Sequence, residues 1–380
     1  MTHRERFNAI MHFRAVDRCP LYDFNFWNET LPEWQRQGLP TNVNRRNAAE
    51  HFGLDVSLGG GESENWLTGL KVGLFPGFET RILEDDGDIY TQVQEDGVIV
   101  RAQRSSVSIP MHVGHSLVDR ASWEKLYKPR LQPDKGRLPA NWDERVRNWT
   151  DVGRANPVFC YAGSLFGWLR DWMGLEAISM VPYDDPAWFE DMVTTIADLQ
   201  VWILTQALQT GARFDACNMW EDMCYNAGPL LSPAHFKQYL VPQYRRITEL
   251  LRGHGCDVVW VDCDGKIDEL LPLWLDAGVN CMFPVEIGNW ADPVRFRKQY
   301  GRALLMMGGF SKHILARSKR EIDEEIARLT PLVEDGGYIP FCDHRVPPNV
   351  PYENYLHYCR TVRRVWGRNV NLPPMLAGEE

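Results

Sequence analysis

The segment VVWVDCDG, residues 258–265, contains the pattern from which the fold of this 380-residue chain can be inferred. A short apolar run leads into two carboxylates and a glycine, and a helical stretch from Ile267 to Ala277 follows. A short buried strand followed by a loop and a helix is the repeating unit of α/β folds. The segment therefore predicts one strand–loop–helix unit.

The same pattern recurs along the chain from about residue 156. Short apolar runs end in glycine or acidic residues, and most are followed by a longer helical stretch such as Lys237 to Arg252. The runs cover residues 157–161, 214–219, 258–261, 280–283, 303–307 and 338–341. With N-terminal strands near Cys19 and Asp55, the count reaches eight. We therefore expect an α/β fold of the (β/α)8 TIM barrel type, with an open parallel sheet as the alternative.

A different pattern interrupts this series between about Lys71 and Arg104. Residues 79–103, ETRILEDDGDIYTQVQEDGVIVRAQ, alternate in polarity and contain Asp-Gly pairs at 86–87 and 96–97. Asp-Gly between alternating runs is a strong hairpin signal. We expect an N-terminal antiparallel β-hairpin insertion at about 71–104, within a single barrel domain that spans residues 1–380.

The composition excludes several classes of protein. Acidic residues outnumber basic ones by 51 to 41, and no run of Lys or Arg suggests a nucleic-acid partner. No window contains the roughly 18 apolar residues of a membrane span, and the first residues do not resemble a secretory leader. The nine cysteines form no CxxC pair, which is typical of reduced, buried thiols. We expect a soluble, cytoplasmic protein without a membrane or nucleic-acid partner.

The strongest catalytic candidates are Asp262 and Asp264, because catalytic groups of α/β barrels follow the carboxyl ends of the strands. Residues two apart on an extended chain point to the same side, so both carboxylates are expected to converge while Cys263 faces away. Two carboxylates on one side suit a divalent cation or proton transfer. In the alternative interpretation, Asp264 only caps the helix that begins near Ile267.

His344 is the second candidate. It lies in FCDHR, residues 341–345, and the prolines of residues 346–351 turn the following segment into a stiff loop at the catalytic rim. A histidine there can act as a metal ligand or a general base near neutral pH. The alternative is an ordinary surface or hydrogen-bonded histidine.

Further candidates follow other strands. Glu221 or Asp222 is expected to act as acid, base or ligand, with Trp220 as a wall of the pocket, although one of the acids can instead begin the next helix. Glu286 has a similar position at a strand end. We expect Glu286 to contact the substrate.

Two other segments provide candidates for substrate binding. The turn at Gly308 and Gly309 can bring Lys312 to the pocket, or it can serve only to connect a strand to a helix. Asn25 and Trp27 follow the first strand and can recognise a substrate by hydrogen bonding and stacking. Packing at the rim is the alternative role for Asn25 and Trp27.

Several motifs together resemble one known superfamily. They are THRERF (2–7), DRCP (17–20), DCDG (262–265), LLPLWLDAG (270–278), GGYIP (336–340) and VPPNVPYENY (346–355). The chain resembles the uroporphyrinogen decarboxylase superfamily, which includes cobalamin-dependent methyltransferases. The resemblance spans nearly the whole chain, and it implies a (β/α)8 barrel with its site at the carboxyl ends of the strands.

The chain departs from the true decarboxylase after the first strand. That enzyme has an arginine pair there for substrate carboxylates, whereas residues 23–29 read DFNFWNE. Decarboxylation of a porphyrinogen, which has eight carboxylates, is therefore not expected. The zinc methyltransferases of the superfamily have a His-x-Cys pair and a final Cys. The resemblance places Asp262, Asp264 and His344 at those positions, which implies an O/N metal site for zinc, or for manganese, iron or magnesium.

These observations predict a metal-assisted methyltransferase for a small methylated substrate. Asp262, Asp264 and His344 are expected to hold the reacting centre, and Glu221 or Asp222 to handle protons. The resemblance implies a corrinoid protein as methyl acceptor, and the sequence is compatible with a homodimer. The alternatives are a metal-free proton-transfer network, a lyase that decarboxylates a small carboxylate other than uroporphyrinogen, and a non-catalytic ligand-binding barrel.

Overall fold

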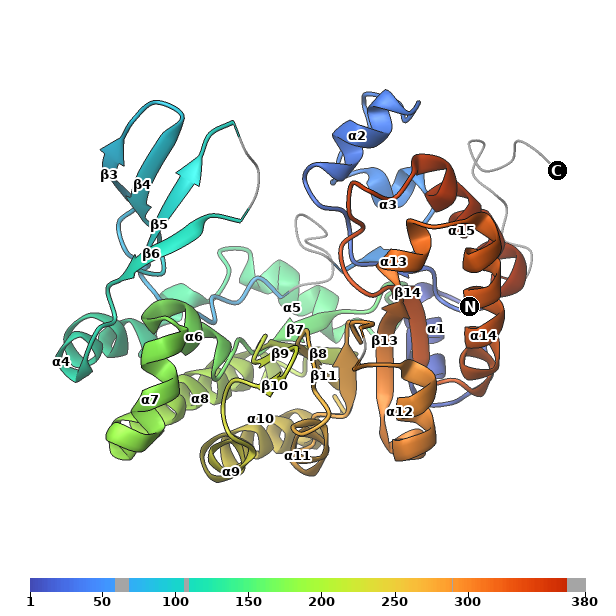
Figure 1. Ribbon diagram of the computed structural model, residues 1–380. Coiled ribbons are helices and arrows are strands. Elements are labelled where there is room, and N and C mark those ends of the chain that lie inside the picture. Colours follow the sequence, from blue (N-terminus) through green and yellow to red (C-terminus); the bar gives the residue numbers. More distant parts are fainter. Residues whose placement is uncertain (59–67, 106–108, 289, 368–380) are drawn as a thin grey trace.

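A parallel sheet with helices around it forms the main body of the protein (Figure 1). The computed structural model describes residues 1–58, 68–105, 109–288 and 290–367. Its largest sheet has six parallel strands in the order β14-β13-β12-β11-β8-β7. Their bounds are β7 (Phe159–Tyr161), β8 (Ala216–Trp220), β11 (Val259–Asp262), β12 (Cys281–Phe283), β13 (Leu305–Phe310) and β14 (Tyr338–Cys342). The predicted mixed α/β architecture is thereby confirmed.

Two further strands, β1 (Tyr22–Asp23) and β2 (Val56–Ser57), pair in parallel with each other. β1 lies against β14, and a parallel bridge joins Phe26 to Val346 just beyond the two strands. These are the two N-terminal strands expected from the sequence. Among the described residues β2 and β7 exchange no ladder hydrogen bonds, so closure of the barrel remains a prediction.

The helices follow the strands and cover the sheet. They are α1 (His3–Met11), α2 (Thr30–Arg36), α3 (Ala48–His51), α4 (Arg120–Ser122), α5 (Trp142–Thr150), α6 (Gly167–Met173), α7 (Leu175–Asp184), α8 (Pro186–Leu208), α9 (Pro233–His235), α10 (Val241–Gly253), α11 (Leu271–Asp276), α12 (Pro293–Tyr300), α13 (Lys312–Leu315), α14 (Lys319–Asp335) and α15 (Tyr352–Val365). The longest, α8, begins where the Asp185 carboxylate accepts the N–H of Trp188, with Pro186 at its first position. No helix in the described ranges is long and apolar enough to cross a membrane.

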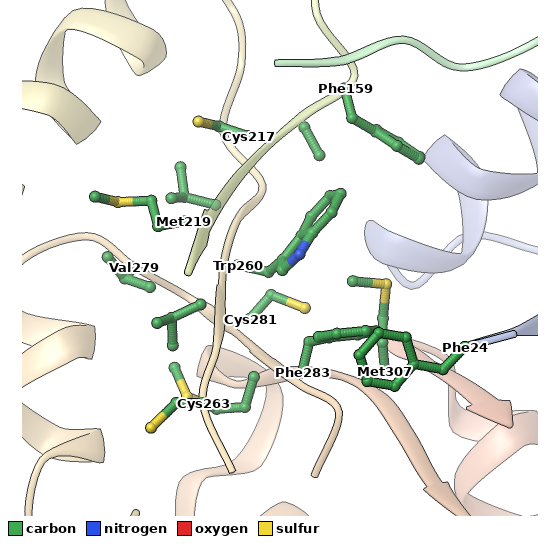
Figure 2. Close-up of a cluster of buried hydrophobic side chains, with 14 of the residues drawn as sticks. Phe24, Phe159, Cys217, Met219, Trp260, Cys263, Val279, Cys281, Phe283 and Met307 are labelled. Atoms are coloured by element: carbon green, nitrogen blue, oxygen red, sulfur yellow. The ribbon is translucent and has the colours of Figure 1, made fainter. Parts of the chain in front are cut away.

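The strands alternate between an inner and an outer face. Trp260 and Phe159 lie on the inner side with their rings edge to face and centroids 5.0 Å apart, whereas Cys217 and Met219 point to the opposite side (Figure 2). Phe7 of α1 packs on Phe159 from the amino end of the strands, at 5.0 Å between ring centroids. Buried aromatic side chains therefore fill the interior at that end.

A second sheet stands apart from the parallel strands (Figure 1). It is antiparallel, with the order β3 (Arg81–Asp85), β4 (Ile89–Val93), β5 (Val98–Gln103) and β6 (Met111–His115). The predicted hairpin insertion at about 71–104 lies in this region. The sheet has four strands, and its last strand ends beyond the predicted boundary. A smaller antiparallel pair, β9 (Cys224–Tyr225) and β10 (Gly228–Pro229), follows β8.

Candidate functional site

Three aspartates meet at the carboxyl ends of β8 and β11, which are neighbours in the parallel sheet. The carbonyl of Asp262, the last residue of β11, accepts the N–H groups of Glu221 and Asp222 at 2.9 and 3.3 Å. The N–H of Asp264 donates to Oδ1 of Asp222 at 3.2 Å. Asp222, Asp262 and Asp264, which we call the acidic cluster, are therefore fixed beside one another.

Mutual repulsion and burial govern the electrostatics of the acidic cluster. Burial, reinforced by Asp222 and Asp264, holds the pKa of Asp262 well above its usual range. Burial and the neighbouring Asp264 raise the pKa of Asp222 to about 6. Oδ1 of Asp264 is buried and accepts no hydrogen bond from the described residues. Such a cluster can retain a proton at neutral pH, or it can attract a cation.

His344 reaches the acidic cluster from the loop after β14. Its Nε2 lies 3.3 Å from Oδ2 of Asp264. Its ring stacks on Trp27, with 5.2 Å between ring centroids and 15° between ring planes, and also contacts Phe24. The structure therefore brings together His344, Asp264 and Trp27, which the sequence placed in three separate segments.

The chemistry of the donors suits a divalent cation, because carboxylates and an imidazole form an O/N set. However, no three His, Cys, Asp or Glu side chains in the described part of the chain are gathered closely enough to hold a metal ion. Asp262, Asp264 and His344 therefore share one region but not a ligating geometry. The helix-capping alternative for Asp264 does not apply, since α11 begins at Leu271 without a side-chain cap.

Glu221 faces away from the acidic cluster and anchors the start of α6. Its buried carboxylate accepts the hydroxyl groups of Ser164 and Tyr244 at 2.9 and 2.6 Å. It also accepts the backbone N–H groups of residues 165–167, at 2.8 to 3.0 Å. A helix N-terminus stabilises negative charge through these N–H groups. Of the two neighbouring acids, only Asp222 belongs to the acidic cluster.

The backbone at Asp222 adopts an uncommon conformation, with φ of 42°. Arg170 of α6 donates a hydrogen bond to the carbonyl of Asp222, and its guanidinium lies 5.3 Å from the ring centroid of Trp220. Non-glycine residues with positive φ are often found at functional sites, where surrounding contacts compensate the strain. Trp220 therefore lies beside the acidic cluster, in contact with Arg170.

Glu286 and Lys312 pair with each other. Nζ of Lys312 donates to Oε1 of Glu286 at 2.6 Å, and Oε2 of Glu286 accepts the N–H of Gly265 at 3.1 Å. The buried carboxylate of Asp343 accepts the N–H groups of Ile287 and Lys312 at 2.7 and 2.8 Å. Burial raises the pKa of Asp343 to about 6. Glu286 and Lys312 thus connect the loops that follow β11, β12 and β13.

Asn25 shapes the turn after β1. Its φ is 65°, its Oδ1 accepts the N–H of Phe26 at 2.8 Å, and its carbonyl accepts the N–H of Val346 at 3.0 Å. This arrangement connects the loop after β1 to the loop after β14. It also places Trp27 against His344.

Sequence reasoning missed two arginines of the site. The Arg345 guanidinium lies 5.4 Å from the ring centroid of Trp27 and 6.0 Å from that of Phe24. Burial, followed by the positive charge of Arg45, lowers the pKa of Arg345, while Asp262 opposes this effect. The sequence could have indicated Arg345 as a site residue, because Arg345 directly follows the candidate His344. Arg45 lies outside every candidate motif, and only the fold brings it to the site.

Comparisons with known proteins agree with this architecture. A family model described as uroporphyrinogen decarboxylase (URO-D) matches residues 88–365. A solved structure, a methyltransferase from Methanosarcina mazei, is similar with a TM-score of 0.58 and 16% sequence identity, covering 96% of this chain and 98% of that chain. At this identity the likeness shows the fold alone. None of the curated proteins matches the chain.

Proposed function

This chain belongs to the uroporphyrinogen decarboxylase (URO-D) family, and on that premise we propose that it is a methyltransferase that demethylates a small substrate. The meeting of His344 with the acidic cluster at the strand ends carries the proposal. Such a cluster suits a reaction in which a leaving group is activated and protonated. The overall likeness to a structure named a methyltransferase supports the choice of reaction.

The chain's own residues provide a route for the proton. Demethylation breaks the bond between the methyl carbon and a heteroatom, and that heteroatom then takes up a proton. Asp222 donates this proton, because its carboxylate lies within the acidic cluster and Glu221 is fully engaged by α6. A corrinoid on a partner protein would supply the strong nucleophile that accepts the methyl group. Trp27 and Trp220 border the substrate.

A divalent cation is part of this proposal. Asp262, Asp264 and His344 would hold it, with zinc preferred over manganese, iron and magnesium, and it would supply Lewis acidity toward the leaving atom. The buried Oδ1 of Asp264, which lacks a hydrogen-bond donor in the described ranges, supports this placement. Binding requires the three side chains to approach one another more closely than they do in this structure.

We also propose that the eight parallel strands close into the single barrel predicted for residues 1–380. The contact between β1 and β14, the first and last of these strands, supports closure of the barrel at that junction. In a closed barrel, catalytic residues are contributed by the ends of several strands, and the residues proposed here also follow several strands.

The test of the reaction is methyl transfer from a panel of small methylated compounds to added cob(I)alamin. The wild-type protein is expected to demethylate at least one class of compound, and Asp222→Asn to reduce that rate. Release of carbon dioxide from small carboxylates, without any methyl transfer, would contradict the proposal.

Metal binding has a separate test. Elemental analysis should find stoichiometric divalent metal in the purified wild-type protein and clearly less in Asp264→Ala and His344→Ala. Asp276→Ala is the matched control, because Asp276 is an exposed carboxylate paired with Arg245 outside the site. Stoichiometric metal in all variants would remove Asp264 and His344 from the ligand set.

A decarboxylase of a small carboxylate is the second candidate. Asp262, whose pKa is raised, can protonate a carbanion, and Arg345 provides a nearby cation for a carboxylate. Carbon dioxide release that depends on Asp262 would favour this reaction.

A further inference from the structure

Arg345 differs from three other arginines that are buried or half-buried, Arg137, Arg154 and Arg297. Within the described residues its guanidinium forms no ion pair and no hydrogen bond, and its contacts are the aromatic rings of Trp27 and Phe24. By contrast, the buried guanidinium groups of Arg137 and Arg154 and the half-buried one of Arg297 each donate to backbone carbonyls or carboxylates. A partly desolvated charge without a partner costs free energy. Arg345 is therefore held in an environment that favours an anion.

The neighbourhood of Arg345 strengthens this preference. The positive charge of Arg45 acts on Arg345, and an anion between the two would relieve their repulsion. The negative charge of Asp262 also acts on Arg345, but the two side chains form no ion pair among the described residues. The guanidinium carbon of Arg345 lies 5.4 Å from the ring centroid of Trp27 and 6.0 Å from that of Phe24, and these rings accept none of its N–H groups as a carboxylate would.

We propose that Arg345 binds a carboxylate of the substrate by its guanidinium fork. The inference rests on the proposed function, because the bound carboxylate belongs to the molecule on which the acidic cluster acts. A planar carboxylate matches two parallel N–H donors of arginine. Trp27 and Phe24, which flank Arg345, accommodate an apolar body attached to that carboxylate. The substrate class is therefore a small, largely apolar methylated carboxylate.

Benzoate and benzamide form a matched pair of probes, because they have the same size and differ in charge. Binding of each is measured by isothermal titration at low ionic strength for the wild-type protein and for three variants, Arg345→Met, Arg345→Lys and Arg302→Met. Arg302 is the control, since it is an exposed arginine paired with Asp335 away from the acidic cluster. Far-UV circular dichroism and the melting temperature establish that each variant is folded.

The wild-type protein is expected to bind benzoate in clear preference to benzamide. Arg345→Met should weaken benzoate binding by roughly tenfold or more, as expected for the loss of a charged hydrogen bond. Arg345→Lys keeps the charge but loses the fork, so its affinity should be intermediate, and Arg302→Met should match wild type. Equal binding of both probes, no binding by wild type, or unchanged benzoate binding in folded Arg345→Met would overturn the inference.

The titrations measure binding alone, so their results do not depend on whether the protein transfers a methyl group. The titrations require no corrinoid and no turnover. Carboxylate binding that depends on Arg345, in a protein that transfers no methyl group, would therefore contradict the proposed function and leave the carboxylate site intact. Methyl transfer that Arg345→Met leaves unchanged would contradict the carboxylate site and leave the function intact.

Discussion

Glu221 and Asp222 are adjacent in the sequence, yet their carboxylates face different parts of the molecule. Glu221 accepts hydrogen bonds at the start of α6, whereas Asp222 accepts the N–H of Asp264. The positive φ of Asp222 changes the direction of the backbone at this point. One acid therefore stabilises the fold, and the other lies where the chemistry is proposed.

We predict that Glu221→Gln destabilises the protein by about 3 kcal/mol or more. The amide nitrogen of glutamine is a donor and would face the backbone N–H groups that now donate to the carboxylate. Urea unfolding measures the effect, with Glu249→Gln, at an exposed position on α10, as the control. An unchanged unfolding free energy would show that α6 does not depend on this charge.

Asp222→Asn should reduce activity without reducing stability, in contrast to Glu221→Gln. We expect turnover in the methyl-transfer assay to fall by about 100-fold, the usual scale for loss of a general acid. Stability should stay the same or rise slightly, because the neutral side chain relieves repulsion within the acidic cluster. Asparagine can still accept the N–H of Asp264. Full activity in the variant would exclude Asp222 as the proton donor.

The positions of several individual site residues could be predicted from the sequence. The ends of neighbouring parallel strands meet, so residues placed at those ends, namely Asp222, Asp262, Asp264 and His344, could be predicted to lie close together. The alternation of neighbouring side chains indicates that Glu221 and Asp222 differ in direction, but which of the two faces Asp264 could not be predicted from the sequence. The positive charge of Arg45 could not be predicted either, because its position depends on the path of a loop.

At the level of helices and strands, periodicity was sufficient for the parallel sheet. Each apolar run expected as a strand overlaps one of β7, β8, β11, β12, β13 and β14. The prediction for the antiparallel region was less accurate, because β6 (Met111–His115) lies beyond the predicted boundary and no Asp-Gly pair precedes it after β5. Register and close approach between strands also depend on three-dimensional contacts that periodicity does not report.

Gly308 in β13 shows how close such an approach is. A Cβ at this position would lie 1.9 Å from the Pro284 carbonyl oxygen, and φ of Gly308 is 90°. We predict that Gly308→Ala costs more than about 3 kcal/mol or prevents folding. Gly253→Ala, at the end of α10 with no heavy atom within 4 Å, should be neutral or stabilising by up to about 1 kcal/mol. The two variants are compared by thermal unfolding, and equal melting temperatures would contradict this prediction.

An ion pair between His12, after α1, and Asp257, before β11, makes stability dependent on pH. Their hydrogen bond, with His12 Nε2 3.0 Å from Asp257 Oδ2, raises the pKa of His12 above 6.5 and lowers that of Asp257 below 3.8. The contribution of His12 to the free energy of unfolding is fully present below pH 6.5. It is lost as the pH rises through the raised pKa of His12 in the folded state. The contribution of Asp257 to the free energy of unfolding is present above pH 3.8, and it is lost as the pH falls through the lowered pKa of Asp257 in the folded state.

We therefore predict that His12→Gln lowers the unfolding free energy at about pH 6 but not at about pH 9. Both side chains are partly exposed, so solvent screening limits the effect to about 1 kcal/mol or less. Denaturant unfolding at the two pH values measures it. An equal effect at both would indicate that packing, and not the charge, is responsible.

On the scale of the whole molecule, all nine cysteines are free and buried. Their thiolates are the reactive form, and burial raises the pKa of Cys281 and Cys342, among others. We predict no rapid reaction of the native protein with Ellman's reagent and reaction of nine thiols in denaturant. Ala177→Cys, at an exposed position on α7, is the positive control. A fast-reacting native thiol in the wild-type protein would contradict this expectation.

Phe7 and Trp260 pack on Phe159 and fill the interior at the amino ends of the strands, whereas the acidic cluster lies at their carboxyl ends. If the small molecule and the acceptor protein of the proposed reaction both approach from the carboxyl ends, the small molecule must arrive before the acceptor protein covers this face. The demethylated product can depart only after that protein has lifted away. The proposed reaction then follows an ordered mechanism. Excess acceptor protein inhibits it, because acceptor that binds first blocks the small molecule.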